Sequence, residues 1–225
     1  ARTPADVVVI LSGTADGGEV VGALAAAIGE TAALAVPGYL AGLAAGAGLA
    51  IVLTLAPRAA AVSMPFAIAL RAVPIVTTAP LVVLLLGRGA VGGVALVAVM
   101  VFFPTLIACL EGLRRAPGQA LDVLRCYAAP AGVQLVRVRI PAMLPAFFAA
   151  ARMSVPAAVL AVTVVEWLAL GSGVGSLMAL AASRSGYDLL AGAVVVVTAL
   201  SALGYALVSA VEARVLRVYA PEQAT

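Results

Sequence analysis

The chain consists of long apolar runs separated by short segments that carry most of its charges. Three runs contain no charged residue and two are each interrupted by a single arginine: 31–57, 89–110 and 189–211, then 59–87 with Arg71 and 140–165 with Arg152. A helix needs about 20 apolar residues to cross a bilayer. The pattern therefore predicts an all-α, polytopic membrane protein with five transmembrane helices.

Composition supports this class. Hydrophobic residues make up 64% of the chain and charged residues 10%, whereas soluble domains contain about 25% charged residues. The basic residues lie in segments beside the apolar runs, so the positive net charge does not indicate a nucleic-acid partner. The chain has no histidine and only two cysteines. This excludes a metal-dependent membrane protease and gives no sign of a disulfide framework.

The distribution of arginines predicts the orientation in the membrane. If the loop 111–141 is cytoplasmic, eight arginines lie inside and three outside: Arg58, Arg114, Arg115, Arg125, Arg137, Arg139, Arg214 and Arg217, against Arg2, Arg88 and Arg184. Cytoplasmic loops carry an excess of basic residues. The C-terminus is then inside and the N-terminus outside, so we expect a further helix before residue 1. Alternatively, this chain is one half of a longer membrane protein.

These considerations divide the chain into three segments. Residues 1–28 form an external segment, in which the Ala-rich stretch 20–29 is expected to be a short amphipathic helix or, alternatively, a plain linker. Residues 29–217 form the transmembrane domain, and 218–225 form a cytoplasmic tail. Pro117 and Gly118 begin, and Pro130 ends, a short helix expected over 119–128 in the cytoplasmic loop.

Residues 122–141 resemble the EAA loop of bacterial ABC-importer permeases. In that family an acidic residue is followed, at fixed spacing, by Gly, two apolar residues and Pro; here the positions hold Asp122, Ala128, Val138, Ile140 and Pro141. Asp replaces the usual Glu, and Ala128 replaces the Gly. The resemblance implies the small ABC-importer permease fold, with a short helix that contacts a separate ATPase.

Other motifs widen the resemblance to permeases of the nitrate/sulfonate/taurine type. Matching positions are Pro65, Arg71, Pro74, Pro80 and Gly87, then Arg152, and then Glu166, Gly173 and Gly175. Seven of these positions are expected to belong to the translocation pathway or a gate: Arg71, Pro74, Pro80, Arg152, Glu166, Gly173 and Gly175. Prolines bend membrane helices where neighbours satisfy the freed carbonyls, but they are also common in such helices for no special reason.

The charges within the apolar runs leave alternatives open. A charge inside the bilayer costs about 2.5–3.5 kcal/mol on insertion scales. Arg71 therefore either faces the pathway or anchors at the cytoplasmic edge, and we expect Arg152 to be buried against neighbouring helices. Glu166, beside Trp167, is either an interfacial acid in an aromatic belt or an ion-pair latch to Arg152 or Arg71. The glycines after it predict a tight turn or a re-entrant segment.

The expected helix in the cytoplasmic loop offers a contact surface for the ATPase. Leu121, Leu124 and Tyr127 share one face at helical spacing, and exposed apolar residues on a loop helix indicate a partner. Packing of some of them against the membrane spans is the alternative. Asp122 and Arg125 would set the orientation, and Ala128 and Ala129 complete the contact segment.

No phosphate-binding loop is present in this sequence, so the chain is not expected to be an enzyme, and ATP and Mg would be bound by the partner ATPase. The resemblance implies ATPase subunits, a second permease subunit, identical or homologous, and an extracytoplasmic solute-binding protein in the bacterial cytoplasmic membrane. The cargo would be a small anion or organic solute of the nitrate, sulfonate or taurine kind. The alternative function is a membrane transporter or scaffold subunit without ATP coupling.

Overall fold

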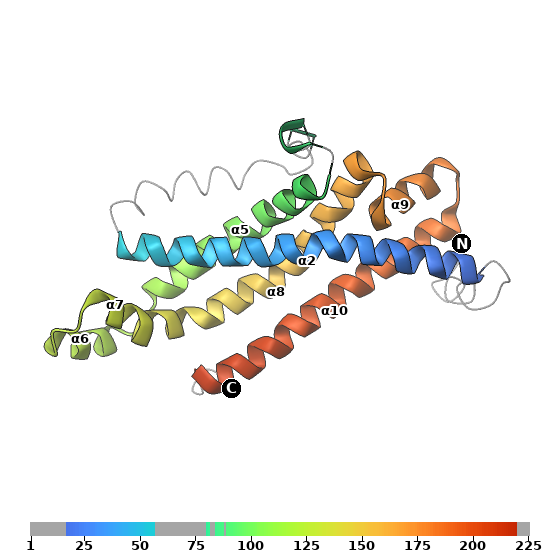
Figure 1. Cartoon of the computed structure of the whole chain (residues 1–225). Coiled ribbons are helices and arrows are strands. Elements are labelled where there is room, and N and C mark those ends of the chain that lie inside the picture. Colours follow the sequence, from blue (N-terminus) through green and yellow to red (C-terminus); the bar gives the residue numbers. More distant parts are fainter. Residues whose placement is uncertain (1–16, 57–79, 82–83, 88, 220–225) are drawn as a thin grey trace. The chain divides into compact units, whose positions relative to one another are not determined.

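The computed structural model describes residues 17–56, 80–81, 84–87 and 89–219, and all regular structure within these ranges is helical. The long helices are α2 (Gly17–Leu55), α5 (Ala90–Arg114), α8 (Ile140–Val165) and α10 (Tyr187–Tyr219) (Figure 1). The shorter ones are α6 (Gly118–Cys126), α7 (Ala131–Gln134), η1 (Leu135–Arg139), η2 (Glu166–Leu170) and α9 (Gly173–Ser183), where η marks a π-helical segment.

Four helical segments in the described part of the chain are long and apolar enough to cross a membrane. They are Gly22–Leu55, Ala90–Arg114, Ala131–Leu170 and Leu189–Arg217. Each contains or closely overlaps one of the runs expected from the sequence, which confirms an all-α, multi-pass membrane protein. The fifth expected crossing, 59–87, falls largely outside the described residues.

The expectation of a short, separate helix over 20–29 is wrong. Helix α2 runs without a break from Gly17 to Leu55, so this stretch is the beginning of the first long helix. In the sequence Glu30 directly precedes the charge-free run 31–57, which hides the continuity of the helix. An acid is tolerated within such a helix when its carboxylate finds hydrogen-bond donors, and Glu30 has one in α9, as described below.

The chain packs as two compact units, and the long helices α2, α5, α8 and α10 contribute residues to both. The first unit comprises Ala1–Tyr39, Pro74–Ala98 and Pro156–Leu203, and the second comprises Leu40–Val73, Val99–Val155 and Gly204–Thr225. Each unit has its own buried apolar residues, and each contains one of the two arrangements described below.

In the second unit the core joins α2 and α5 to the segment that begins α8. Leu53, Leu113, Leu135 and Met143 belong to one buried cluster. Small residues allow the close approach: a Cβ added at Gly112 would lie 2.9 Å from the Met143 Cα. Because Leu135 of η1 is part of this core, the loop that contains α6 and α7 is anchored to the long helices at its end.

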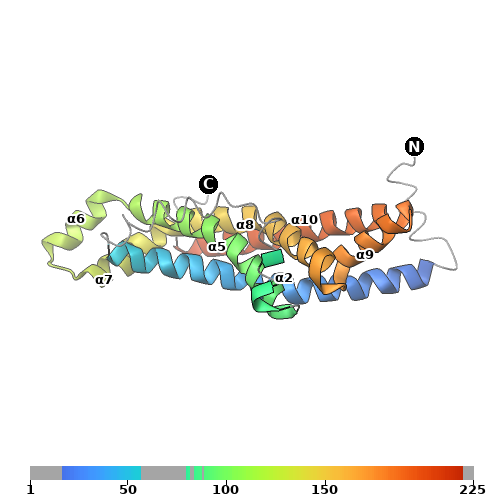
Figure 2. The ribbon, with the colours of Figure 1, turned by 90° about the horizontal axis from the view of Figure 1, so that it is seen from above.

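In the first unit α9 packs against α2 and α10. Ala27, Val174 and Ala193 form a buried cluster that takes one residue from each of these helices. Both views show α9 beside the first part of α2 (Figures 1 and 2). A second cluster packs Leu96 of α5 against Val165 of α8. These contacts fix the position of η2 and of the turn that leads into α9.

Candidate functional site

The amino end of α9 is bound by side chains from two other elements. The Gly173 N–H donates to Glu30 Oε2 at 2.7 Å, and the Gly175 N–H donates to Glu166 Oε2 at 2.9 Å. The Val174 N–H, between them, donates to the Thr31 hydroxyl at 3.1 Å. The first N–H groups of a helix have no partner within the helix. Three consecutive ones are satisfied here by α2 and η2.

The two glycines of the sequence motif leave room for the Glu166 carboxylate. A Cβ added at Gly173, which has a φ of +80°, would lie 2.7 Å from Glu166 Oε2 and closer still to the other carboxylate atoms. A Cβ added at Gly175 would collide with the carbonyl of Thr163 and lie 2.9 Å from the Glu166 Cβ. The spacing of Glu166, Gly173 and Gly175 therefore has a steric cause, and the structure brings these three predicted residues together.

The structure does not support an exposed interfacial Glu166 or a latch from Glu166 to Arg152, and the alternative latch to Arg71 lies outside the described residues. Glu166 is fully buried, whereas an interfacial acid would be exposed; its neighbour Trp167 is 62% exposed. The latch to Arg152 is also wrong, because Arg152 pairs with Glu212 instead. Glu166 begins a π-helical turn, Glu166–Leu170, and successive residues on a helix point in different directions, so one is buried while the next is exposed.

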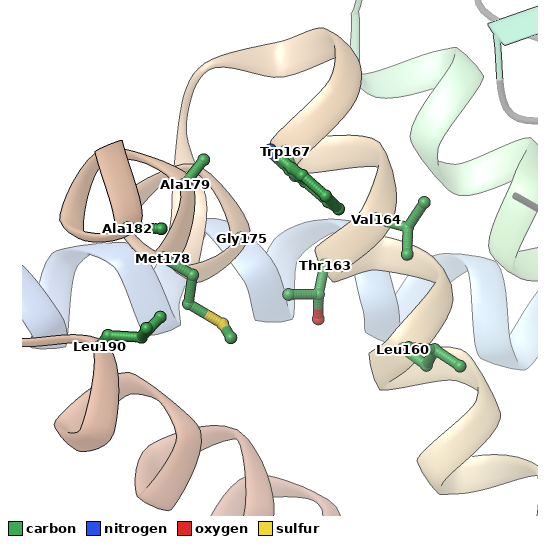
Figure 3. Close-up of a pocket in the computed structure, with 9 residues that line it drawn as sticks. All are labelled: Leu160, Thr163, Val164, Trp167, Gly175, Met178, Ala179, Ala182 and Leu190. Atoms are coloured by element: carbon green, nitrogen blue, oxygen red, sulfur yellow. The ribbon is translucent and has the colours of Figure 1, made fainter. Parts of the chain in front are cut away.

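An apolar pocket of about 320 Å³ lies beside this arrangement in the first unit. Leu160, Thr163 and Val164 of α8 form one wall, and Met178 of α9 points into the space from the opposite side (Figure 3). The Thr163 hydroxyl donates to the carbonyl of Val159, so it presents no free donor to the pocket. The pocket is therefore suited to apolar groups rather than to a charged solute.

In the second unit Arg152 is held by Glu212. The Arg152 Nη1 donates to Glu212 Oε2 at 2.6 Å, and this bond joins α8 to α10. Arg152 was expected to be buried against neighbouring helices; it contacts one, α10, but remains 35% exposed, and the sequence did not identify its acidic partner. Glu30, Thr31 and Glu212 were all missed. Their common signal is that each is a polar residue within, or at the edge of, a long apolar helix.

The short helix of the loop 111–141 forms as expected. Helix α6 spans Gly118–Cys126, and α7 follows beside it in both views (Figures 1 and 2). Asp122 accepts a hydrogen bond from Arg125 at 2.9 Å, and both side chains are exposed. Pro130 begins α7 rather than ending α6.

The C-terminus of α6 explains the motif position at which Ala replaces Gly. Ala128 has a φ of +51°, the left-handed conformation. The Ala128 N–H donates to the Arg125 carbonyl, and the Ala129 N–H donates to the Leu124 carbonyl, each at 2.9 Å. These two bonds and the left-handed residue form a Schellman motif, in which Gly is preferred. Ala128, at the position where the resemblance leads us to expect Gly, therefore adopts a conformation that Gly accepts more readily.

The contact face proposed for α6 needs one correction. Leu121 is buried, at 7% exposure, and packs within its own chain, so it is not available to a partner. This is the alternative that the sequence left open, and it follows from the amphipathic character of a short helix anchored to the long ones. Tyr127 is 82% exposed and Val123 is 56% exposed, whereas Leu124 is partly buried.

The structure does not test the roles predicted for the remaining pathway residues. Arg71 and Pro74 lie outside the described residues. Pro80 is described and exposed. The roles assigned to these three residues stay predictions.

Comparison with known proteins identifies the family that these features resemble. The family described as binding-protein-dependent transport system inner membrane component matches residues 38–217. The chain is 32% identical over 164 residues to a Haemophilus influenzae protein named as a probable ABC transporter permease, covering 73% of this chain and 67% of that protein.

Two further relatives match over shorter stretches. A formylaminopyrimidine transport permease of Halalkalibacterium halodurans is 30% identical over 111 residues, covering 49% of this chain and 44% of that protein. A Bacillus subtilis protein named for the transport of aliphatic sulfonates is 33% identical over 106 residues, covering 47% of this chain and 38% of that protein. The chain thus matches less than half the length of these two relatives.

Proposed function

This chain belongs to the family of binding-protein-dependent transport system inner membrane components, and on that premise we propose that it forms half of the solute pathway of an ATP-driven importer and is coupled through α6 to a separate ATPase. The observation that carries this proposal is the exposed apolar surface of Val123 and Tyr127 on α6. A helix in a connecting loop would otherwise expose polar side chains.

The construction of α6 suits the transmission of motion from a partner. Leu121 of α6 is buried, and Leu135 of η1, which follows α7, belongs to the core of the second unit. The Schellman motif at Ala128 stops the helix abruptly, and the Asp122–Arg125 pair orders its outer side. A partner that displaces a rigid segment moves the helices to which the segment is packed.

The partners in this proposal are nucleotide-binding ATPase subunits, which would hold ATP and Mg, a second permease subunit and an extracytoplasmic solute-binding protein. The second permease subunit is either identical or homologous. The described spans consist mainly of aliphatic residues with few polar groups, and a wet pathway for a polar solute would need the surfaces of two such subunits. The proposed location of the protein is the bacterial cytoplasmic membrane, with the C-terminus in the cytoplasm.

The proposed cargo is a small organic solute or anion. Support comes from relatives named for formylaminopyrimidine and for aliphatic sulfonates. The relatives are named for different solutes, so membership of the family does not select the cargo, and we propose that the binding protein does.

Co-purification tests the coupling. The double variant Val123→Asp/Tyr127→Asp should leave the permease inserted and folded but abolish association with the ATPase and transport, because two carboxylates would be buried unpaired in the contact. Gln119→Asp, at an exposed position in the first turn of α6, is the matched control: it adds a charge to the same helix without removing an apolar side chain. Retention of the ATPase by the double variant would show that the coupling contact lies elsewhere.

A further inference from the structure

The apolar pocket of the first unit is open to the surroundings of the protein along one wall. Leu160 of α8 and Trp167 of η2 line this wall (Figure 3), and their side chains are 56% and 62% exposed. Apart from the Trp167 indole N–H and the Thr163 hydroxyl, which is bonded within its own helix, every lining side chain is apolar. The pocket therefore suits a hydrocarbon group that enters from the side.

The membrane spans place one end of the pocket at a membrane surface. The span Ala131–Leu170 ends three residues after Trp167, and the span Leu189–Arg217 begins next to the lining residue Leu190. Helix α9, which connects them, has 11 residues and is too short to cross a bilayer, so both span ends lie at the same surface. Trp side chains are enriched at this level of a membrane. The pocket thus runs from the headgroup level inward, where the surrounding medium is lipid.

A cationic side chain lies beside the same end of the pocket. The turn that ends α9 is a second Schellman motif: the Gly186 N–H donates to the Ala181 carbonyl at 2.8 Å, and Ser185 has a φ of +54°. This turn presents Arg184, two residues after the lining residue Ala182. Arg184 is exposed and belongs to none of the ion pairs among the described side chains. A guanidinium group in this position can bind a phosphate through two parallel hydrogen bonds.

We propose that the pocket binds one acyl chain of an anionic phospholipid, whose phosphate lies at Arg184. An acyl chain gains little by leaving bulk lipid for an apolar wall, because lipid tails are as apolar as leucine. The preference for one lipid therefore comes from the charge at the rim, since basic sites beside membrane helices attract anionic headgroups.

The far wall of the pocket suits a flexible hydrocarbon chain. Met178 of α9 points into the space (Figure 3), and an unbranched thioether side chain adapts its shape to an irregular neighbour. Because α8, α9 and α10 all contribute to the lining, a bound acyl chain would contact three helices at once and support α9 in its place between the two spans.

The chain contains its own reporter for this site. Trp167 is the one tryptophan in the 225-residue sequence, and it lines the pocket. Bromine atoms on an acyl chain quench tryptophan fluorescence on contact. The full chain would be reconstituted in phosphatidylcholine vesicles that contain a small fraction of phosphatidylglycerol brominated in its acyl chains. We expect the loss of fluorescence to exceed the fraction of brominated lipid, whereas brominated phosphatidylcholine at the same fraction should quench only in proportion.

Two variants separate the pocket from its charged rim. Ala179→Phe fills the pocket and should reduce quenching to the proportional level; Leu180→Phe, which adds the same ring at the next, exposed position outside the lining, should not. Arg184→Gln should also remove the excess quenching, and Arg184→Lys, which keeps the charge, should retain most of it. Because Arg184 is exposed, its variants carry the test even if Ala179→Phe does not fold.

Three results would overturn the proposal. Proportional quenching by brominated phosphatidylglycerol in the unmodified protein would show that Trp167 faces bulk lipid only. Absence of quenching by either lipid would show that protein, such as a second permease subunit, covers the pocket. Excess quenching that persists in Arg184→Gln would show that the headgroup is bound elsewhere. The measurement requires neither an ATPase nor a cargo, so its failure would leave the proposed transport function untouched.

Discussion

The Arg152 guanidinium and the Glu212 carboxylate lie 2.6 Å apart and join α8 to α10 within the second unit. Glu212 is 12% exposed and Arg152 is 35% exposed, so neither charge is free to be fully hydrated. The pair differs in this respect from Arg115–Glu111, which is 3.7 Å apart with exposed fractions of 80% and 57%. Only in the Arg152–Glu212 pair, therefore, does each charge depend on the other for its stabilisation.

We predict that Glu212→Gln destabilises the protein by about 3 kcal/mol, because it leaves the Arg152 charge partly buried without a counter-charge. The double variant Arg152→Met/Glu212→Leu should recover most of this loss, since replacing both members of a buried pair by apolar residues is close to neutral. Thermal unfolding of the purified protein measures both effects.

Glu111→Gln is the control for that series. Exposed ion pairs contribute about 0–1 kcal/mol, so its unfolding temperature should stay near that of the unmodified protein. Equal losses for Glu111→Gln and Glu212→Gln would mean that the bond between α8 and α10 has no special stabilising role. A double variant less stable than Glu212→Gln would point to the same conclusion.

The glycines before and at the start of α9 allow two effects of an alanine substitution to be compared: strain of the backbone alone, and backbone strain together with a steric clash. Gly171 and Gly173 both have positive φ values, +69° and +80°, but a Cβ at Gly171 meets nothing within 4 Å, whereas one at Gly173 strikes the Glu166 carboxylate. Gly171→Ala should therefore cost about 1–2 kcal/mol, from backbone conformation alone. Gly173→Ala should cost clearly more and displace the end of α9.

A helical glycine gives the baseline for this comparison. Gly48 has ordinary helical geometry and open space around its Cα, so Gly48→Ala should be neutral or slightly stabilising. Unfolding temperatures of the three alanine variants would follow the order Gly48, Gly171, Gly173, from highest to lowest. Equal effects at Gly171 and Gly173 would show that the Glu166 carboxylate moves aside at little cost.

Because Ala128 has a left-handed backbone conformation, we expect that a substitution there can stabilise the C-terminal end of α6. Ala128→Gly should stabilise the Schellman motif by about 1 kcal/mol, because Gly adopts a φ of +51° without the Cβ clash. The amide of Ala129, which donates to the Leu124 carbonyl, should then exchange with solvent about fivefold more slowly. Hydrogen-exchange mass spectrometry of the loop measures this change.

Ala129→Gly is the matched control, since Ala129 does not have a positive φ. Glycine there should lower protection by about 0.5–1 kcal/mol, because it widens the conformational freedom of the unfolded chain without relieving strain. If both glycine variants lowered protection, the left-handed geometry at Ala128 would not limit the stability of α6.

The sequence predicted the long helices and α6 because their signals are local. A run of about 20 apolar residues, or a pair of helix-breaking prolines around a short helix, can be recognised within one segment of the sequence. Accordingly, α5, α6 and α10 begin or end within a few residues of the expected positions. The spacing of Glu166, Gly173 and Gly175 was also visible, although its cause was not.

The partners of the charged residues could not be predicted in the same way. Glu30 and Gly173 are 143 residues apart in sequence, and Arg152 and Glu212 are 60 apart. Only tertiary packing brings such pairs together, so a residue such as Glu30 is indistinguishable in sequence from the polar end of an apolar run. The same ambiguity placed Leu121 on the contact face of α6, although packing buries it.

The orientation in the membrane is the last prediction, and two cysteine positions test it. The excess of arginines around residues 111–141 predicts that α6 is cytoplasmic and that α9 faces outward. Cys126 at the end of α6 is exposed, and so is Ser183 at the end of α9, whereas Cys109 is buried.

In intact cells a membrane-impermeant thiol reagent should therefore modify a Ser183→Cys variant at the new position and spare Cys126. In inverted vesicles from cells that express the permease alone, Cys126 should react instead, and Cys126→Ser should abolish that signal. Labelling of Cys126 from outside, with the residue at 183 protected, would reverse the topology and would place α6 where no cytoplasmic ATPase could reach it.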